Sequence, residues 1–215
     1  MKLKDYLISL MAIVIVVILP HSGLIPLPFA YSIPIILFIW FCLKYNGESF
    51  SDLGFRIKSL SLKSLLIGSL IAILIFSFLH FIFFPSLSTI IEFEDVDVEL
   101  YNQIRGNTGF YIFILIMGWI IGGLYEEIVF HGFIFTRLEK ILPGKFATLF
   151  AFLLTSLIFG LYHIQLGVAD AINAFLAGAG YHILILYNKR NLWYGIFCHA
   201  VFDTIVITLL YVGYL

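Results

Sequence analysis

Charged residues are scarce in this sequence. Asp, Glu, Lys and Arg make up 12% of its 215 residues, while 62% are hydrophobic and 18% are aromatic. Soluble domains carry about 25% charged residues, so the composition excludes a water-soluble globule, and the high aromatic content excludes a disordered chain. The 12 basic residues do not outnumber the 13 acidic ones, which argues against a nucleic-acid partner. The class that remains is an all-α polytopic membrane protein, a helix bundle surrounded by lipid.

Cysteine is also rare. The chain has two cysteines, Cys42 and Cys198, and each lies inside an apolar run. A disulfide framework needs more cysteines in polar, loop-rich surroundings. We therefore expect both thiols to be buried hydrophobic residues rather than bridge partners.

Long apolar runs dominate what is present. A helix needs about 20 apolar residues to cross the hydrocarbon core, and turn-forming residues between Pro20 and Pro28 divide the first run. No small-x-small cleavage site follows Leu19, so we expect the first block to be a retained anchor. The sequence predicts a single transmembrane domain over residues 1–215 with about seven membrane helices. They are expected near residues 6–20, 29–43, 64–84, 109–130, 146–163, 170–187 and 191–214.

Basic residues are distributed unequally between the two sides of this topology. Only Arg105 falls in a loop on one side, and every other Lys or Arg falls on the other. Those on the loaded side are Lys2, Lys4, Lys44, Arg56, Lys58, Lys63, Arg137, Lys140, Lys145, Lys189 and Arg190. Cytoplasmic loops carry the excess of Lys and Arg, so the N-terminus is predicted to be cytoplasmic. We expect an integral protein of a prokaryotic inner membrane.

Three sets of ionisable residues stand out inside the predicted membrane helices in the second half of the chain. They are Glu126, Glu127, His163, His199 and Asp203. An ionisable group at the centre of a bilayer costs roughly 2.5–3.5 kcal/mol on insertion scales. Such residues mark functional sites or interhelical partners, so these five are the candidate site residues.

Helical spacing indicates how these side chains converge. His199 and Asp203 are four residues apart and share a helix face, as do Glu127 and His131. Glu127 is expected to hydrogen-bond His131 locally, which leaves Glu126 to face the bundle interior. Counted from the loops, Glu126, His163 and His199 lie at the same depth in the membrane if the helical hairpin at Pro143 extends about eight residues, about 12 Å, into the cytosol. This geometry predicts one polar centre nearer the cytosolic face, in a chamber that opens toward the cytosol.

The side chains suit hydrolysis with water as the nucleophile. A carboxylate and an imidazole, Glu126 and His163, can remove a proton from a water molecule. His199 and Asp203 can stabilise an oxyanion. The metal alternative has Glu126, His163, His199 and Asp203 holding Zn²⁺. Metal-free water activation is equally open, and no organic cofactor is expected. On residues alone, a structural hydrogen-bond network and a proton relay in a transporter also remain open.

Small and polar residues complete the predicted interior. The pairs Gly118/Gly122 and Ala174/Gly178 have the four-residue spacing that permits close helix approach in lipid, and we expect them to pack. Asp170 and Asn173 are expected to line the chamber. The remaining histidines are expected to pack or to lie at the interface: His21, His80 and His182.

Three ordered motifs resemble one known family. Glu126-Glu127, then Phe159-x-x-x-His163, then His199-x-x-x-Asp203 are similar to the motifs of the CPBP family of CAAX proteases and bacteriocin-processing enzymes, also called Abi, which includes the type II CAAX prenyl endopeptidases. The resemblance covers about residues 109–210, the predicted catalytic core. The segment 52–56 also looks like one often found before that core.

The resemblance implies an intramembrane endopeptidase that acts on membrane-associated, prenylated or leader peptides. Glu126 with His163 would activate the water, His199 and Asp203 would bind the oxyanion or a metal, and Glu127 belongs to the same catalytic set. The partners implied are membrane lipid and a peptide or lipidated protein, and the oligomeric state is open. Alternatives are a non-catalytic scaffold or bacteriocin self-immunity factor that sequesters a peptide and, third, a transporter.

One residue departs from the family pattern. The family's usual Arg is His131 here, whereas Asp at position 203 is within the pattern. An Arg would hold the second glutamate as a permanent ion pair, and a His does so only when protonated. This departure also permits a metal site to which Glu127 and His131 contribute ligands.

Overall fold

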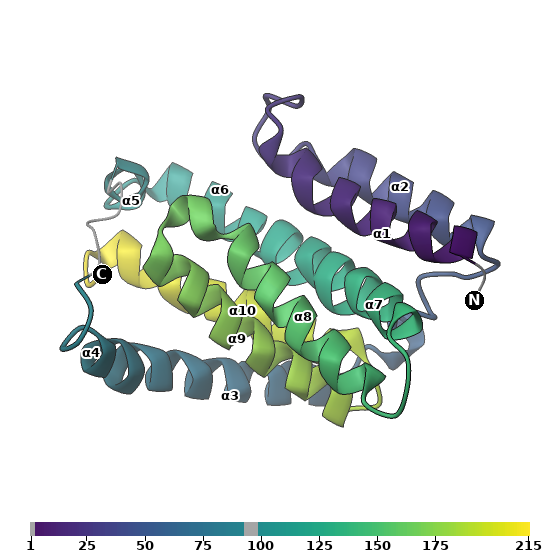
Figure 1. The fold of residues 1–215 in the computed structure, drawn as a ribbon. Coiled ribbons are helices and arrows are strands. Elements are labelled where there is room, and N and C mark those ends of the chain that lie inside the picture. The colour runs from purple at the N-terminus through teal and green to yellow at the C-terminus, as the bar shows by residue number, and fades with distance from the viewer. Residues whose placement is uncertain (1–2, 93–98) are drawn as a thin grey trace.

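The structure is a computed structural model that describes residues 3–92 and 99–215. All regular structure in these ranges is helical, which confirms the all-α prediction. Five helical segments are long and apolar enough to cross a membrane, so the molecule is an integral membrane helix bundle (Figure 1). The segments are Leu62–Leu87, Thr108–Ile141, Ala147–Leu166, Val168–Tyr187 and Leu192–Val212.

Each segment consists of one or more helices. The first joins α3 (Leu62–Phe78), η3 (Leu79–Phe83) and α4 (Phe84–Leu87); the second joins α6 (Thr108–Met117), η4 (Gly118–Ile134) and α7 (Phe135–Ile141). The others are α8 (Ala147–Tyr162) with the short turn η5 (Ile164–Leu166), then α9 (Val168–Tyr187) and α10 (Leu192–Val212). The predicted helix at 109–130 continues to Ile141 because its last turns still pack inside the bundle, where Phe135 and Leu138 are buried.

The first two apolar blocks form shorter helices. These are α1 (Leu3–Ile18), followed by η1 (Leu19–His21), and α2 (Ser32–Tyr45). Their buried residues join the core around η4 through Val16, Ile35 and Ile39. Because both are shorter than a membrane-spanning helix normally is, the count of seven spans and the location of the N-terminus stay predictions. The remaining short helices are η2 (Ile57–Ser59) and α5 (Glu99–Ile104).

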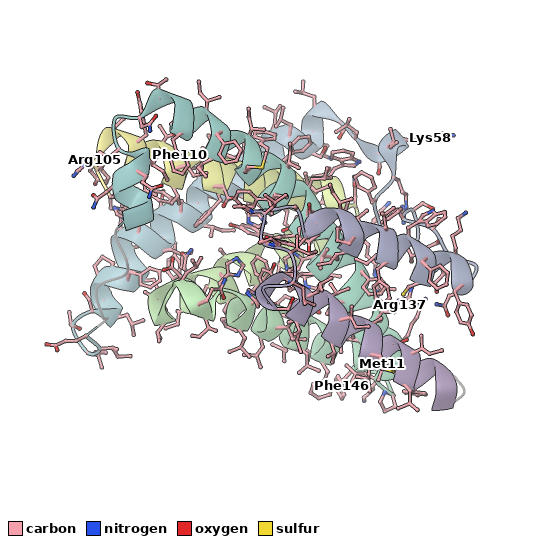
Figure 2. All side chains as sticks on the ribbon, turned by 90° about the horizontal axis from the view of Figure 1, so that it is seen from above. Met11, Lys58, Arg105, Phe110, Arg137 and Phe146 are labelled. Atoms are coloured by element: carbon pink, nitrogen blue, oxygen red, sulfur yellow. The ribbon has the colours of Figure 1, made fainter. Side chains whose placement is uncertain are left out.

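The bundle has two ends, which differ in charge. We call the end with the loops 46–56, 142–146 and 188–191 the basic end; the loops 22–31 and 163–167 lie at the opposite end. Figure 1 shows the N-terminus and the end of α7 on one side, and α4, α5 and the C-terminus on the other. Figure 2 shows Lys58 and Arg137 together at the basic end and Arg105 at the opposite end.

Glycines on η4 bring α10 close. A Cβ added at Gly123 would lie 2.7 Å from the Cβ of Ala200, and one at Gly122 would collide with the carboxylate of Asp203. The predicted packing of Gly118 and Gly122 is therefore confirmed, with α10 as the partner. On α9, Gly178 likewise has no space for a Cβ because the ring of Phe159 fills it.

Ion pairs and backbone hydrogen bonds close the basic end. Glu48 pairs with Arg137 and with Lys140, and Glu139 accepts two hydrogen bonds of 2.7 Å from Arg190. These contacts join α7 to the loop after α2 and to the turn before α10.

The segment 52–56 holds the start of α10. The carbonyl of Gly54 accepts a hydrogen bond from the amide of Leu192 at 3.2 Å. Trp193 donates from Nε1 to the carbonyl of Arg56 at 2.9 Å. Gly54 has φ +96° and no space for a Cβ beside Arg190, so the residue type is required at this turn. Cys42 and Cys198 are free and buried, as predicted.

Candidate active site

The backbone around the two glutamates is not an ordinary α-helix. Residues Gly118–Ile134 form the π-helix η4, in which each amide bonds the carbonyl five residues earlier. A helix of this kind has more residues per turn, so neighbouring side chains diverge less than in an α-helix. Glu126 and Glu127 therefore both face α10, which α-helical spacing did not predict for the two together.

Glu127 bridges two imidazoles. Its Oε2 lies 2.9 Å from Nδ1 of His131, and its Oε1 lies 3.1 Å from Nδ1 of His199. Glu127 is fully buried and His131 is 2% exposed. The predicted contact between Glu127 and His131 is confirmed. The contact with His199 is additional, and it turns Nε2 of His199 away from Glu127.

Glu126 lies between two imidazoles without bonding either directly. Its Oε2 is 3.9 Å from Nε2 of His163 and 3.9 Å from Nε2 of His199. Direct hydrogen bonds between nitrogen and oxygen are 2.7–3.2 Å long, and a polar separation of this size is what a bridging water spans. The structure thus places Glu126 toward the interior, as predicted, with space for one small polar molecule.

Asp203 completes the group from the next turn of α10. Its Oδ1 lies 3.6 Å from Nε2 of His199, the same nitrogen that faces Glu126. All five predicted site residues are therefore brought together, from η4, from the end of α8 and from α10.

His163 is oriented by its own helix. The residue ends α8, and its Nδ1 lies 2.8 Å from the carbonyl oxygen of Phe159. A carbonyl oxygen only accepts, so Nδ1 carries the hydrogen and donates it. In the neutral ring, Nε2 is then an acceptor directed at Glu126. The motif Phe159-x-x-x-His163 thus fixes a tautomer through the backbone of its first residue.

Aromatic rings surround the imidazoles. The ring of Tyr181 stacks on His199 with centroids 4.8 Å apart and planes 25° apart. Phe159 presents an edge to His163 at 4.8 Å and to His199 at 5.8 Å. Sequence reasoning did not single out Tyr181, because one tyrosine among 12 in a hydrophobic chain carries no local signal.

His131, which stands where the family has Arg, packs against a second buried histidine, His182. The ring of His131 lies 4.8 Å from that of His182, between their centroids. Nε2 of His131 and both nitrogens of His182 have no hydrogen-bond partner. The packing role predicted for His182 is confirmed, and so are those of His21, against Tyr162, and His80, against Phe76.

Two cavities meet at the site. The α6 cavity, about 250 Å³, is lined by Phe29, Tyr31, Ile114 and Met117 together with Glu126. The α9 cavity, about 180 Å³, is lined by Leu166, Asp170, Asn173 and Tyr181, among others. The two share His163, His199, Asp203 and Ile207. Asp170 and Asn173 therefore line the chamber, as predicted.

Both cavities extend toward the end of the bundle opposite the basic loops. Tyr31 lies in the loop between α1 and α2, Leu166 in the loop between α8 and α9, and Ile114 near the start of α6. The cavities therefore lie in the half of the bundle away from the basic loops, and the opening of the chamber toward the cytosol stays a prediction. His163 is at the far end of α8 from its basic-end start, so the site is deeper than residue counting from Pro143 indicated.

The donor set does not form a ready metal site. Within the ranges 3–92 and 99–215, no three His, Cys, Asp or Glu side chains are arranged to hold a metal ion. Glu127 already uses both oxygens on His131 and His199, so the variant with Glu127 and His131 as ligands has no free donor pair. Zn²⁺ at Glu126, His163, His199 and Asp203 stays a prediction.

The comparison with protein families matches this part of the chain. Residues 108–205 match the family model described as Type II CAAX prenyl endopeptidase Rce1-like, and this range contains all three motifs. The predicted resemblance is confirmed, and the match indicates a membrane protease at the level of the family. A search of curated proteins and a search of solved structures each gave no match.

Proposed function

We propose that this protein is an intramembrane endopeptidase in which Glu126 and His163 activate a water molecule. The observation that carries the proposal is the position of Glu126 Oε2, 3.9 Å from Nε2 of both His163 and His199. The family match and the convergence of three motifs support it. We propose membrane-associated, prenylated or leader peptides as substrates, and a prokaryotic inner membrane as the location.

The reaction begins with attack on the scissile carbonyl carbon. Glu126 accepts a proton from the water while the water oxygen forms the new bond to carbon, and the carbonyl electron pair moves to the oxygen. His163 offers Nε2 as a second acceptor at the same water, because its Nδ1 hydrogen is held by Phe159.

The protonated ring of His199 donates to the developing oxyanion. Glu127 accepts the hydrogen on Nδ1 at 3.1 Å, so the second hydrogen of the imidazolium, on Nε2, is directed into the site. The carboxylate of Asp203, with Oδ1 3.6 Å from Nε2, stabilises the positive charge of this ring. Donors held in place before the reaction stabilise developing charge without reorganising. The proton held by Glu126 then passes to the leaving nitrogen, the C–N bond breaks, and a carboxylic acid and an amine are released.

Removal of the acid–base pair is expected to abolish cleavage. We propose to purify the wild type, Glu126→Gln and His163→Ala in detergent and to measure hydrolysis of a quenched fluorescent peptide with a farnesylated CAAX end, and of its unprenylated twin. General acid–base catalysis contributes about 10²–10⁴-fold to the rate, so the cleavage rate of each variant should fall by at least about 10²-fold.

Two matched variants serve as controls. Glu139→Gln changes a carboxylate at the basic end, and His80→Ala changes a histidine that stacks on Phe76; both should retain activity. Undiminished cleavage by Glu126→Gln would contradict the proposal. A well-folded wild type that cleaves neither peptide would favour the scaffold or immunity alternative.

Metal dependence is a separate measurement on the same preparation. Elemental analysis gives the metal content, and a chelator titration gives the effect on cleavage. Retained cleavage in the metal-free, chelator-treated protein supports water activation by Glu126 and His163 alone. Loss of cleavage that returns with Zn²⁺ would instead make the four predicted ligands a metal site.

A further inference from the structure

The two cavities at the site differ in the residues that they do not share. Apart from Glu126 and Tyr31, the residues that belong to the α6 cavity alone are apolar or glycine. The α9 cavity alone contains a second carboxylate and an amide, from Asp170 and Asn173. An apolar lining suits the side chains and the lipid of a membrane peptide, whereas a lining with a carboxylate and an amide suits a small polar molecule.

Asp170 and Asn173 lie on one face of α9, because they are three residues apart. Ala177 and Tyr181 continue this face along the cavity. Tyr181 stacks on His199, so the face leads from the two polar side chains to the candidate active site. The distance along the helix from Asp170 to Tyr181 is about 16 Å at helical rise.

Neither polar side chain has a partner in the part of the chain that the structure describes. The carboxylate of Asp170 and the amide of Asn173 form no hydrogen bond or ion pair with residues 3–92 or 99–215, and both residues are partly buried. Polar groups in such surroundings bind water when the protein supplies no partner. The cavity of about 180 Å³ has room for about six water molecules at ~30 Å³ each.

The position of the catalytic side chains separates the two cavities by role. His163 and His199 line both cavities, while Glu126 lines the α6 cavity. A water molecule that comes from the α9 cavity meets Nε2 of each imidazole, and each of these nitrogens is 3.9 Å from Oε2 of Glu126. A peptide in the α6 cavity presents its carbonyl group to the same point from the other side.

We infer that the α9 cavity holds the water from which the nucleophile is drawn, that Asp170 and Asn173 bind this water, and that the peptide lies in the α6 cavity. This inference rests on the proposed function for the identity of the reaction. Each peptide bond that is hydrolysed consumes one water molecule, and the hydrocarbon around the bundle supplies none. Asp170 and Asn173 act through the water and are positioning residues.

Hydroxyl-radical footprinting measures which buried side chains contact water. Purified protein in phospholipid nanodiscs receives a short X-ray pulse, and oxidation of each Phe is quantified by mass spectrometry. Phe202 lines the α9 cavity and is 5% exposed, whereas Phe133 is completely buried and lines neither cavity. The two residues have the same intrinsic reactivity, so Phe202 should be oxidised several-fold faster than Phe133.

Two variants test whether this water feeds the reaction. Asp170→Leu and Asn173→Leu keep the approximate size of the side chain and remove its hydrogen bonding. In each, oxidation of Phe202 should fall toward that of Phe133. A displaced reactant can cost up to about 10²-fold in rate, so kcat should fall by about tenfold, while KM for the quenched peptide stays the same because the α6 cavity is unchanged.

Two further variants serve as comparisons. Asp170→Asn still binds water, so it should recover most of the Phe202 oxidation that Asp170→Leu loses. Gln165→Leu makes the same kind of change at an exposed residue outside both linings, and it should alter neither oxidation nor kcat. If Asp170→Leu does not fold, Asn173→Leu carries the test.

Three results would overturn the inference. These are equal oxidation of Phe202 and Phe133 in the wild type, an unchanged kcat in both Leu variants, and a rise in KM in place of the fall in kcat. The footprint does not depend on catalysis, so Glu126→Gln should show the wild-type pattern. The expected footprint without cleavage by the wild type would contradict the proposed function and leave the water site in place.

Discussion

At the scale of single residues, the adjacent glutamates have different surroundings. Glu127 is fully buried and accepts from two imidazoles, at 2.9 and 3.1 Å. Glu126 has no direct partner and faces the two cavities. The contacts of Glu127 suit a residue that orients His199. The surroundings of Glu126 suit a residue that binds a water molecule.

Glu127→Gln is expected to reduce stability and activity together. A Gln side chain turns one of the two acceptor oxygens into a donor that faces an imidazole N–H, and a buried group without its partner costs about 1–3 kcal/mol. For a chain of this length, 1 kcal/mol corresponds to about 2–4 °C in Tm. Thermal unfolding followed by Trp fluorescence should show a fall of several degrees, beside the control Glu139→Gln. An unchanged Tm with complete inactivity would instead make Glu127 a direct participant in the chemistry.

His131→Arg, which restores the family residue, should be destabilising alone and tolerated together with His182→Ala. His131 is 2% exposed and lies against His182, so a larger side chain overpacks this space at a cost of about 1–3 kcal/mol. Removing the imidazole of His182 makes room for the guanidinium to reach Glu127. The test is a double-mutant cycle on Tm, in which the two changes should couple favourably by more than about 0.5 kcal/mol. Simple additivity would show that the two histidines do not share this space.

At the scale of elements, the pairing of η4 with α10 sets the geometry of the site. The helices approach through glycine, and Ala200, next to His199, touches Gly123. The distance between Glu127 and His199 therefore depends on the absence of a Cβ on η4.

Gly123→Ala should reduce activity without touching a site residue. The new methyl group would lie 2.7 Å from the Cβ of Ala200 and 3.1 Å from the carbonyl oxygen of Ile196, so α10 must move. A misplacement of about 1 Å can cost 10²-fold in rate, and we expect at least a tenfold loss of kcat. Gly109→Ala, on the same long helix with 3.7 Å to its nearest neighbour, is the matched control. Ala200→Gly should partly rescue Gly123→Ala, and its failure to do so would place the defect elsewhere.

Much of this element-level arrangement follows from sequence, and part of it does not. The apolar runs predicted the long helices, and i,i+4 spacing predicted the contact of Glu127 with His131. Contacts between helices, such as those of Glu127 with His199 and of Tyr181 with His199, have no local signal in the chain. The π-helical hydrogen bonding of Gly118–Ile134 was not predicted either, because hydrophobic periodicity was interpreted with α-helical spacing.

At the scale of the whole molecule, ion pairs join the helices at the basic end, and the two cavities lie in the opposite half of the bundle. Charge bias distinguished the two ends from sequence alone. Which half of the bundle contains the cavities depends on where each helix starts and stops, and counting residues from Pro143 did not show this. Glu48 stabilises the basic end because its carboxylate pairs with Arg137, which is 3% exposed.

Glu48→Gln is expected to destabilise the whole bundle. It leaves the buried guanidinium of Arg137 without its counter-charge, and breaking a buried pair in this way costs about 3–5 kcal/mol. The Tm in detergent should fall by roughly 6 °C or more. The control Glu139→Gln breaks a pair with Arg190, which is half exposed, and pairs at the surface contribute about 0–1 kcal/mol. Equal shifts in the two variants would show that Arg137 finds another partner.

The brevity of the first two helices bears on the lipid around the protein. With 16 and 14 residues, α1 and α2 extend only about 24 and 21 Å at helical rise, against about 30 Å of hydrocarbon. Bilayers adapt to short helices by thinning locally. If α1 and α2 span the membrane as predicted, the bilayer beside them is thinner than elsewhere, and lipid headgroups lie closer to the loop that contains Tyr31.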